Sequence, residues 1–193
     1  MVAVNSTMVE LGTPAPAFDL PDPSGTRHTL QSVSADRDAL VVAFICNHCP
    51  YVKHIARELG LVTQQFMGRN VGVVGIMSND IENYPEDGPE QMAQYARSVG
   101  WDFPYLLDED QAVATAYRAA CTPDFFVYDS DLRLSYRGQF DDARPSSSAA
   151  PTGADLRAAV NAAVAGTTPD TPQHPSMGCN IKWKPGNEPD YFG

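Results

Sequence analysis

Cys46 and Cys49 are the residues whose types and spacing point most directly to chemistry. They flank Asn47 and His48 in a C-x-x-C motif that Pro50 follows. Two thiols three residues apart can close a small disulfide ring, and a helix that begins there stabilises a thiolate through its unpaired N–H groups and its dipole. The motif therefore predicts dithiol redox chemistry.

The segments on either side of the motif must position the two thiols. Residues 40–45 form an uninterrupted apolar run, which is typical of a strand covered on both faces. From Pro50 to Phe66 the apolar residues recur on one helical face, and Gly68 provides a stop. The motif is therefore predicted to lie where a strand passes into a helix.

Pro50 indicates which sulfur lies at the helix N-terminus. Proline has no N–H and a fixed φ, so it prefers the first helical position, which makes Cys49 the N-cap residue. Cys46 then lies in the preceding loop. Because the dipole acts within the first turn, we expect Cys49 to form the more stable thiolate.

The rest of the chain alternates between strand and helix patterns. Residues 11–25 are predicted as an extended lead-in with a turn at 22–25. The later segments are a strand at 71–77, helices at 90–99 and 110–118, a hairpin of strands at 125–128 and 132–136, and a helix at 154–165. This order predicts an α/β fold in which helical crossovers join parallel strands and an antiparallel pair forms one edge.

Length and composition fit one domain. A chain of 193 residues buries about 70 per cent of its unfolded surface and needs no disulfide to fold. Residues 1–10 are predicted as an N-terminal tail, 11–166 as the domain, and 167–193, which contain five prolines, as a C-terminal tail. Four apolar residues indicate that this tail docks on the domain: Ile181, Trp183, Tyr191 and Phe192.

The net charge and the targeting patterns indicate which binding partners and which cellular compartment to expect. The 13 Lys and Arg residues against 24 Asp and Glu give a net charge of -11, which argues against nucleic acid and anionic membranes as partners. Neither a signal peptide pattern nor a membrane-spanning apolar run is found, so we expect a cytoplasmic protein. In that compartment the four cysteines are more often catalytic, metal-binding or buried thiols than a disulfide framework.

Several motifs together resemble a known group. The lead-in GTPAPAFDL at 12–20, the C-x-x-C after a strand, and CTPDFF at 121–126 resemble the thioredoxin-like AhpC/TSA superfamily. More narrowly, CNHCPYVK at 46–53 and GCNIKWK at 178–184 resemble its peroxiredoxin-like branch. The resemblance covers about residues 11–185 and implies a thioredoxin-like fold, with a central mixed sheet flanked by helices.

The resemblance also bears on the roles of the two cysteines. Cys49 matches the peroxidatic cysteine of peroxiredoxins, whereas in ordinary thioredoxins the first cysteine of the pair is the exposed nucleophile. True peroxiredoxins carry Thr or Ser three residues before their nucleophile, where this chain has Cys46. The partner arginine of that family is not identified by the sequence, which offers Arg118, Arg133 and Arg137. These departures favour exchange with disulfides over reduction of peroxides.

His48 lies between the two sulfurs. In its protonated form it would favour a thiolate and lower the pKa of the neighbouring cysteine. The alternative is an exposed loop histidine without a role. Lys53 and His54, one turn into the helix, either add positive potential or belong to a solvated face.

The resemblance places Thr122-Pro123 in a cis-proline loop that faces the redox cysteines. Such a loop leaves the preceding backbone free to pair with a bound peptide. Cys121 would then be a third thiol that resolves a sulfenic acid or a mixed disulfide, or else a small buried hydrophobe. Cys179 lies in the C-terminal tail, and the sequence leaves open whether the tail covers the site.

The first functional hypothesis is a cytoplasmic thiol-disulfide oxidoreductase. Cys49 is its nucleophile and Cys46 its resolving thiol. The supporting residues are His48, Asn47, Pro50, Cys121, Thr122 and Pro123. Its partners would be protein or small-molecule disulfides and a reductant of the thioredoxin or glutathione type, with no dissociable cofactor.

Two alternatives remain. In an antioxidant thiol peroxidase, Cys49 would attack a hydroperoxide and its sulfenic acid would condense with Cys46 or Cys121. In a non-catalytic binding protein, zinc or another soft metal would be held by Cys46, His48 and Cys49 with Cys121 or Cys179.

Overall fold

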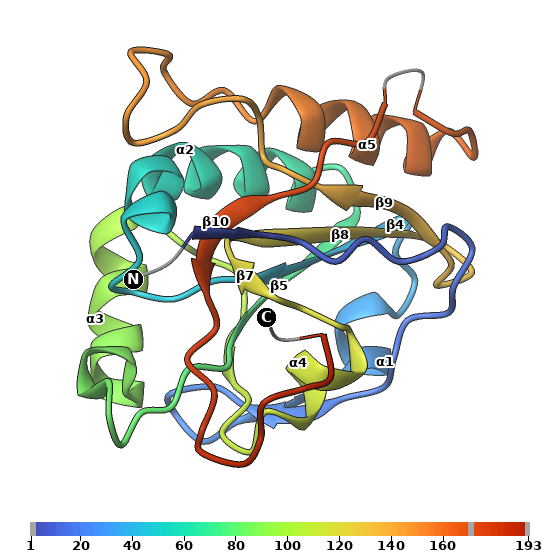
Figure 1. The fold of residues 1–193 in the computed structure, drawn as a ribbon. Coiled ribbons are helices and arrows are strands. Elements are labelled where there is room, and N and C mark those ends of the chain that lie inside the picture. Colours follow the sequence, from blue (N-terminus) through green and yellow to red (C-terminus); the bar gives the residue numbers. More distant parts are fainter. Residues whose placement is uncertain (1–2, 170–171, 192–193) are drawn as a thin grey trace.

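A five-stranded mixed sheet forms the centre of the computed structural model, which describes residues 3–169 and 172–191 (Figure 1). The strand order is β6-β5-β4-β8-β9. The bounds are β4 Ala39–Phe44, β5 Val71–Met77, β6 Tyr105–Leu107, β8 Asp124–Asp129 and β9 Leu134–Gly138. β4, β5 and β6 run parallel, and β8 and β9 add an antiparallel edge. The expected thioredoxin-like arrangement is confirmed.

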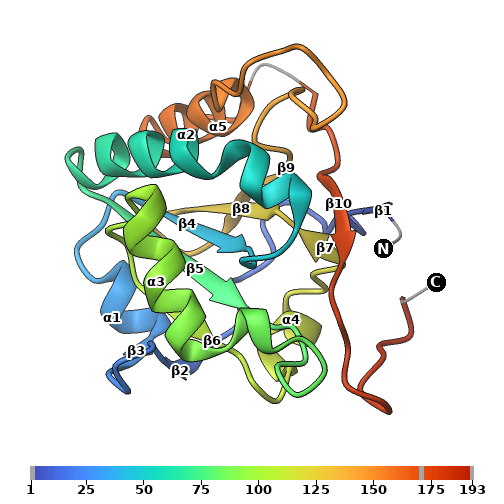
Figure 2. The ribbon, with the colours of Figure 1, turned by 90° about the vertical axis from the view of Figure 1, so that its left-hand side faces the viewer.

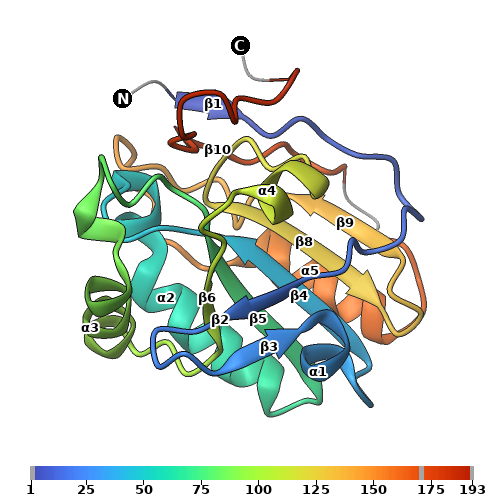
Figure 3. The ribbon, with the colours of Figure 1, turned by 90° about the horizontal axis from the view of Figure 1, so that it is seen from below.

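Helices cover both faces of this sheet (Figure 3). One face carries α2 (Pro50–Met67), α3 (Pro89–Val99) and α5 (Ala154–Val164). The other carries α1 (Leu30–Ser34), α4 (Ala112–Ala116) and the hairpin of β2 (Asp19–Pro21) and β3 (Arg27–Thr29). A short 3-10 turn at Pro85–Asp87 precedes α3. None of the helices in the described residues has both the length and the apolar character that a membrane crossing requires.

The continuous apolar run of β4 is explained by its central place. All six residues of β4 are buried. Successive side chains of a strand point to opposite faces, so Val41 and Ala43 pack under α2 and α5, while Val42 and Phe44 pack under β2 and α4. A strand that is buried on both faces has no polar face, so its sequence shows no alternation of apolar and polar residues.

A second, three-stranded sheet joins the two ends of the chain to the domain. Its strands are β1 (Ala3–Asn5), β10 (Met177–Asn180) and β7 (Cys121–Thr122), in the order β1-β10-β7. The sequence analysis did not predict these strands. We call them the terminal sheet; Figure 2 shows β1, β10 and β7 next to one another at one side of the large sheet.

The C-terminal tail packs on the domain through the residues that follow β10. Ile181 and Trp183 are buried in the core under β2 and α4. The Tyr191 hydroxyl donates to the carbonyls of Ala114 and Ala119 at 3.3 and 3.2 Å. Phe192, which the sequence analysis also assigned to docking, lies outside the described residues.

Candidate active site

The C-x-x-C motif lies at the start of α2, with Cys49 at the N-cap and Pro50 at the first helical position. Figure 2 shows this first turn of α2 beside β7 and β10. Both thiols are buried, with Cys46 1 % and Cys49 0 % exposed. The strand-to-helix placement agrees with the sequence prediction, but the complete burial of both sulfurs was not foreseen.

Thr122 contacts both sulfurs of the motif. Its hydroxyl oxygen lies 3.3 Å from the Cys46 sulfur, and its carbonyl accepts from the Cys49 thiol at 3.1 Å. The peptide bond between Thr122 and Pro123 is cis, as the resemblance implies. The cis-proline loop is thus the wall against which the dithiol packs.

The pKa of Cys49 is lowered to about 5, chiefly by a hydrogen bond from Cys46. Burial opposes this shift, because it disfavours the charged form. The thiol and the amide of Cys179 and the amide of Val52, in the first turn of α2, lower the pKa further. The net direction favours a thiolate at Cys49.

The pKa of Cys46 is shifted in the opposite direction to that of Cys49. Burial raises the pKa of its thiol well above the ordinary value, and its hydrogen bond to Cys49 and the charge of Asp87 add to the increase. The Thr122 hydroxyl partly opposes them. The two opposite shifts favour a thiolate on Cys49 and a thiol on Cys46 in the reduced site.

Asp87 fixes the loop between the two cysteines. Its buried carboxylate accepts from the Asn47 amide at 2.8 Å, the His48 Nδ1 at 2.6 Å and the Asn79 side chain at 2.7 Å. The Asn47 side chain also accepts from the Tyr105 hydroxyl at 3.1 Å. Sequence reasoning missed Asp87, because nothing distinguishes one carboxylate in the turn-rich segment before α3.

His48 has a partner that the sequence analysis did not expect. Its ring pairs with Asp87 and stacks on Tyr84, with ring centroids 5.6 Å apart and planes 10° apart. Its side chain is only 12 % exposed, so it is not a free loop histidine. The groups that chiefly lower the pKa of Cys49 are Cys46, Cys179 and Val52, and the partner of the His48 ring is Asp87.

The third thiol in contact with Cys49 is Cys179, whereas the sequence analysis had considered Cys121. Cys179 hydrogen-bonds to Cys49, and burial raises its own pKa to about 12. The Cys121 sulfur faces the carbonyls of Pro123 and Ser176, at 3.6 and 3.9 Å. Thr122 already faces the dithiol, and adjacent residues in a strand point to opposite sides, so Cys121 points away.

The three candidate arginines are engaged elsewhere. Arg137 is fully buried and pairs with Asp124 at 2.9 Å. Arg118 lies over the Tyr191 ring at 4.7 Å, and Arg133 donates to the Gly12 carbonyl at 3.5 Å. Among the contacts of the described residues, none joins these arginines to Cys49.

A metal-like cluster lies on the Cys46 side of the site. One ligand atom each from Cys46, His48 and Asp87 lie within 4.8 Å of one another. Both carboxylate oxygens of Asp87 already accept hydrogen bonds. A structural zinc site needs four ligands, whereas this cluster has three, and the Cys46 sulfur contacts the Thr122 hydroxyl. The geometry therefore fits a hydrogen-bonded thiol better than a closed metal centre.

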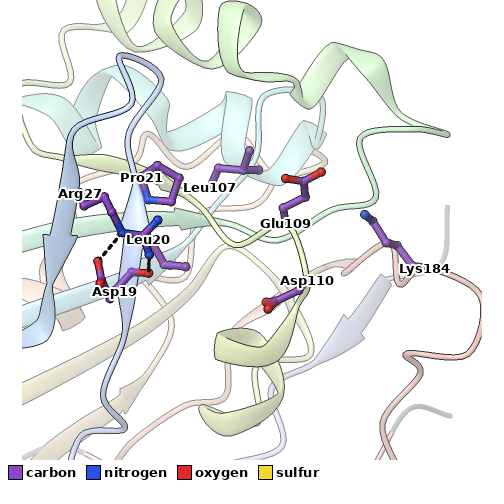
Figure 4. A pocket seen from close by; sticks show the side chains of 8 residues that line it. All are labelled: Asp19, Leu20, Pro21, Arg27, Leu107, Glu109, Asp110 and Lys184. Atoms are coloured by element: carbon purple, nitrogen blue, oxygen red, sulfur yellow. Dashed lines mark hydrogen bonds and ion pairs between the residues drawn. The ribbon is translucent and has the colours of Figure 1, made fainter.

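A hollow beside the dithiol offers an approach to it. It is bounded by the first turn of α2, the cis-proline loop and β10, and its lining includes Tyr51, Pro123, Ser176, Met177 and Arg144. A second hollow, shown in Figure 4, lies on a different part of the surface. Its lining contains no cysteine: Asp19, Leu20, Pro21, Arg27, Leu107, Glu109, Asp110 and Lys184. The lining of the first hollow contains no cysteine either, but it includes Tyr51, in the first turn of α2, and Pro123, which follows the residue that contacts both sulfurs. The first hollow is therefore the nearer of the two to the thiols.

Comparisons with known proteins agree with this description. Residues 11–137 match the AhpC/TSA family. A hypothetical protein from Sinorhizobium meliloti 1021 is 49% identical, with a TM-score of 0.92 over 94% of this chain and 99% of its own. An uncharacterized conserved protein from Geobacillus kaustophilus is also 49% identical, with a TM-score of 0.92 over 96% and 98% of the two chains.

A more distant structure shares the fold alone. Peroxidoxin BcpB from Mycobacterium tuberculosis is 21% identical, with a TM-score of 0.61 over 82% of this chain and 98% of its own. No curated protein sequence matches the chain.

Proposed function

The chain belongs to the AhpC/TSA family of thioredoxin-like redox proteins, and on that premise we propose that it is a thiol-disulfide oxidoreductase. Cys49 is the nucleophile and Cys46 the resolving thiol. One observation carries the proposal: both sulfurs of the motif lie against Thr122, at 3.3 and 3.1 Å, at the start of α2. The resolving thiol is thus held beside the sulfur that it must attack, and it lowers the pKa of Cys49.

The reaction needs two exchanges. The Cys49 thiolate attacks one sulfur of a substrate disulfide; the substrate S–S bond breaks, and the departing thiolate takes a proton from water. Cys46 then loses its proton and attacks the Cys49 sulfur of the mixed disulfide. This step expels the second substrate thiolate, which takes that proton. The substrate gains two electrons, and the protein is left with a Cys46 to Cys49 disulfide.

The oxidised protein is restored by a dithiol or by two glutathione molecules through the same steps in reverse. A cytoplasmic reductant of the thioredoxin or glutathione type fits this requirement. Because Cys49 is 0 % exposed, each exchange also requires a local opening of the wall around it. In this proposal the opening occurs at the hollow between α2, the cis-proline loop and β10, whose lining includes Tyr51 and Pro123.

Peroxide reduction is the second candidate, and the lowered pKa of Cys49 favours it equally. Two observations make it the weaker one. Cys46 occupies the position where true peroxiredoxins carry Thr or Ser. Arg118, Arg133 and Arg137 make contacts elsewhere, so none of these three supplies the guanidinium that polarises a peroxide in that family.

The experiment that tests the proposal is differential thiol alkylation with peptide mass mapping across a series of glutathione redox buffers. We expect a reversible Cys46 to Cys49 disulfide with a defined midpoint potential, unchanged in Cys121→Ser. The proposal fails if the two cysteines never pair. Rapid formation of sulfenic acid at Cys49 with hydrogen peroxide, retained in Cys46→Ser, would instead establish the peroxidase.

A further inference from the structure

β10 occupies the backbone edge next to the cis-proline. It pairs antiparallel with β7, so that Cys179 lies opposite Thr122 and Asn180 opposite Cys121. An extended peptide that pairs with this edge would use the same backbone groups. The C-terminal segment of the chain therefore takes the place that a substrate strand would need.

Gly178 shows how closely β10 approaches the cis-proline loop. A Cβ atom at this position would lie 2.0 Å from the Thr122 carbonyl oxygen and 3.1 Å from the Pro123 nitrogen. Both are backbone atoms and cannot rotate away. Only glycine allows this approach, which brings the next residue, Cys179, to the dithiol.

Cys179 meets Cys49 in two ways. Its thiol and its backbone amide both hydrogen-bond to the Cys49 sulfur. Cys179 is 4 % exposed and packs in the same core cluster as Cys46 and Cys49. The outer side of β10 is held by β1, where Cys179 lies opposite Ala3. The contact between Cys179 and Cys49 is thus held in place by the pairing of β10 with β1 and β7.

We propose that Cys179 is a second resolving thiol, which β10 presents to Cys49 as a substrate strand would present its own cysteine, so that a Cys49 to Cys179 disulfide forms during turnover. This inference rests on the proposed function, since it requires Cys49 to be the nucleophile. It assigns a redox role to a residue outside the C-x-x-C motif.

The added step balances as follows. Once Cys49 carries a substrate thiol as a mixed disulfide, Cys179 loses its proton and attacks the Cys49 sulfur. The bond to the substrate breaks, and the substrate leaves as a thiol with that proton. Cys46 then attacks Cys49 in the same manner, which closes the Cys46 to Cys49 disulfide and returns Cys179 to the thiol form.

The test uses the full chain with two thiols left in place. Cys46→Ser combined with Cys121→Ser retains Cys49 and Cys179, and the serine at 46 keeps a hydroxyl donor beside Cys49. With oxidised glutathione as the probe, we expect a glutathione adduct at Cys49 that disappears as a Cys49 to Cys179 disulfide forms. Intact and peptide mass spectrometry follow both species.

The matched control is Cys46→Ser combined with Cys179→Ser, which retains Cys49 and Cys121. Its glutathione adduct should persist at least tenfold longer, because Cys121 faces Pro123 and Ser176. Equal adduct lifetimes in the two variants would overturn the proposal. Circular dichroism and thermal unfolding of each variant establish that it is folded, and Cys46→Ala replaces Cys46→Ser in both if the serine variant is not.

The two proposals fail in different ways. If Cys46 and Cys49 pair reversibly in the unaltered protein but Cys179 never bonds to Cys49 in the two-thiol variant, the role of Cys179 is refuted and the oxidoreductase stands. If Cys49 takes up no glutathione in any variant, the oxidoreductase itself is refuted, and the role of Cys179 with it.

Discussion

Thr122 is the residue that touches both sulfurs, and its hydroxyl serves Cys46 alone. This hydroxyl lowers the pKa of Cys46 and so assists the resolving step. In Thr122→Val, loss of one hydrogen bond of about 1 kcal/mol should slow resolution about fivefold. The measurement is the lifetime of a glutathione adduct at Cys49 in a Cys179→Ser background, so that Cys46 alone resolves it.

Thr122→Ser is the matched control, because it keeps the hydroxyl and removes only a methyl group. Its adduct should resolve at nearly the rate of the unaltered loop. If valine and serine behave alike, the hydroxyl does not assist Cys46.

The lowered pKa of Cys49 gives a second prediction for single residues. A thiolate stabilised by the fold is present above its pKa and is lost as pH falls through it, so its ultraviolet absorbance should rise with a midpoint of about 5. Cys46→Ala removes the largest cause of the shift, and the midpoint should move up toward the ordinary value of 9.0. Cys46→Ser retains a donor and should stay closer to the unaltered protein.

An unchanged midpoint in Cys46→Ala would show that Cys46 is not what holds the thiolate. In that event the amides of Val52 and Cys179 would have to carry the shift.

At the scale of elements, the strands and helices with a strong local pattern could be predicted. β5 has the bounds that the sequence analysis gave it, and α2 begins at Pro50 as the proline indicates. α4 is shorter than the predicted 110–118, because Gln111 adopts a left-handed φ of 65° immediately before it. A prediction from periodicity extends a helix over the whole apolar pattern. In the structure, the backbone conformation of the flanking residues determines where the helix begins.

The terminal sheet could not be predicted from local sequence patterns. β1, β7 and β10 have two to four residues each, which is too short for an alternation to be recognised. They are stabilised by pairing between residues about 170 positions apart, as for Asn5 and Met177. The contact of Cys179 with Cys49 depends on this pairing, so the sequence favoured Cys121, the cysteine that is close along the chain to the cis-proline.

Gly178 provides the test of how tightly β10 closes the site. In Gly178→Ala the new methyl group would clash with the Thr122 backbone, so β10 must leave β7. We expect Cys49 to be alkylated at least tenfold faster and the free energy of unfolding to fall by about 2 kcal/mol. Gly68→Ala is the matched control, because a Cβ there would have its nearest contacts at 3.5 and 3.6 Å and Gly68 lies at the opposite end of α2 from the dithiol. Unchanged alkylation in Gly178→Ala would mean that β10 is not the barrier.

At the scale of the molecule, the buried pair of Asp124 and Arg137 ties distant parts of the chain together. Both side chains are 0% exposed, and their charged groups lie 2.9 Å apart. Arg137 also donates to Thr7 at 3.0 Å and to the Arg118 carbonyl at 2.7 Å. The residue that sequence reasoning considered for a peroxide site instead joins the N-terminal segment, the loop after α4 and the large sheet.

Arg137→Met should therefore be strongly destabilising, by about 3 to 5 kcal/mol, since it leaves the Asp124 carboxylate buried without its counterion. Burial already raises the pKa of Asp124, and Arg137 opposes that increase. Without Arg137 the folded pKa rises further above the unfolded one. The folded state then prefers the protonated acid, and the variant should lose stability as pH rises from the acid range to neutrality.

Urea unfolding of Arg137→Met at a series of pH values measures this loss. Asp124→Asn combined with Arg137→Met removes the titrating group, so the pH-dependent part of the loss should disappear. The Arg137 side chain donates to Asp124, Thr7 and the Arg118 carbonyl and to neither sulfur of the motif, so the thiolate midpoint of Cys49 should stay near 5 in the folded single variant. A midpoint that moved in Arg137→Met would instead show that the buried pair also determines the pKa of Cys49, so that stability and thiol chemistry are coupled in this fold.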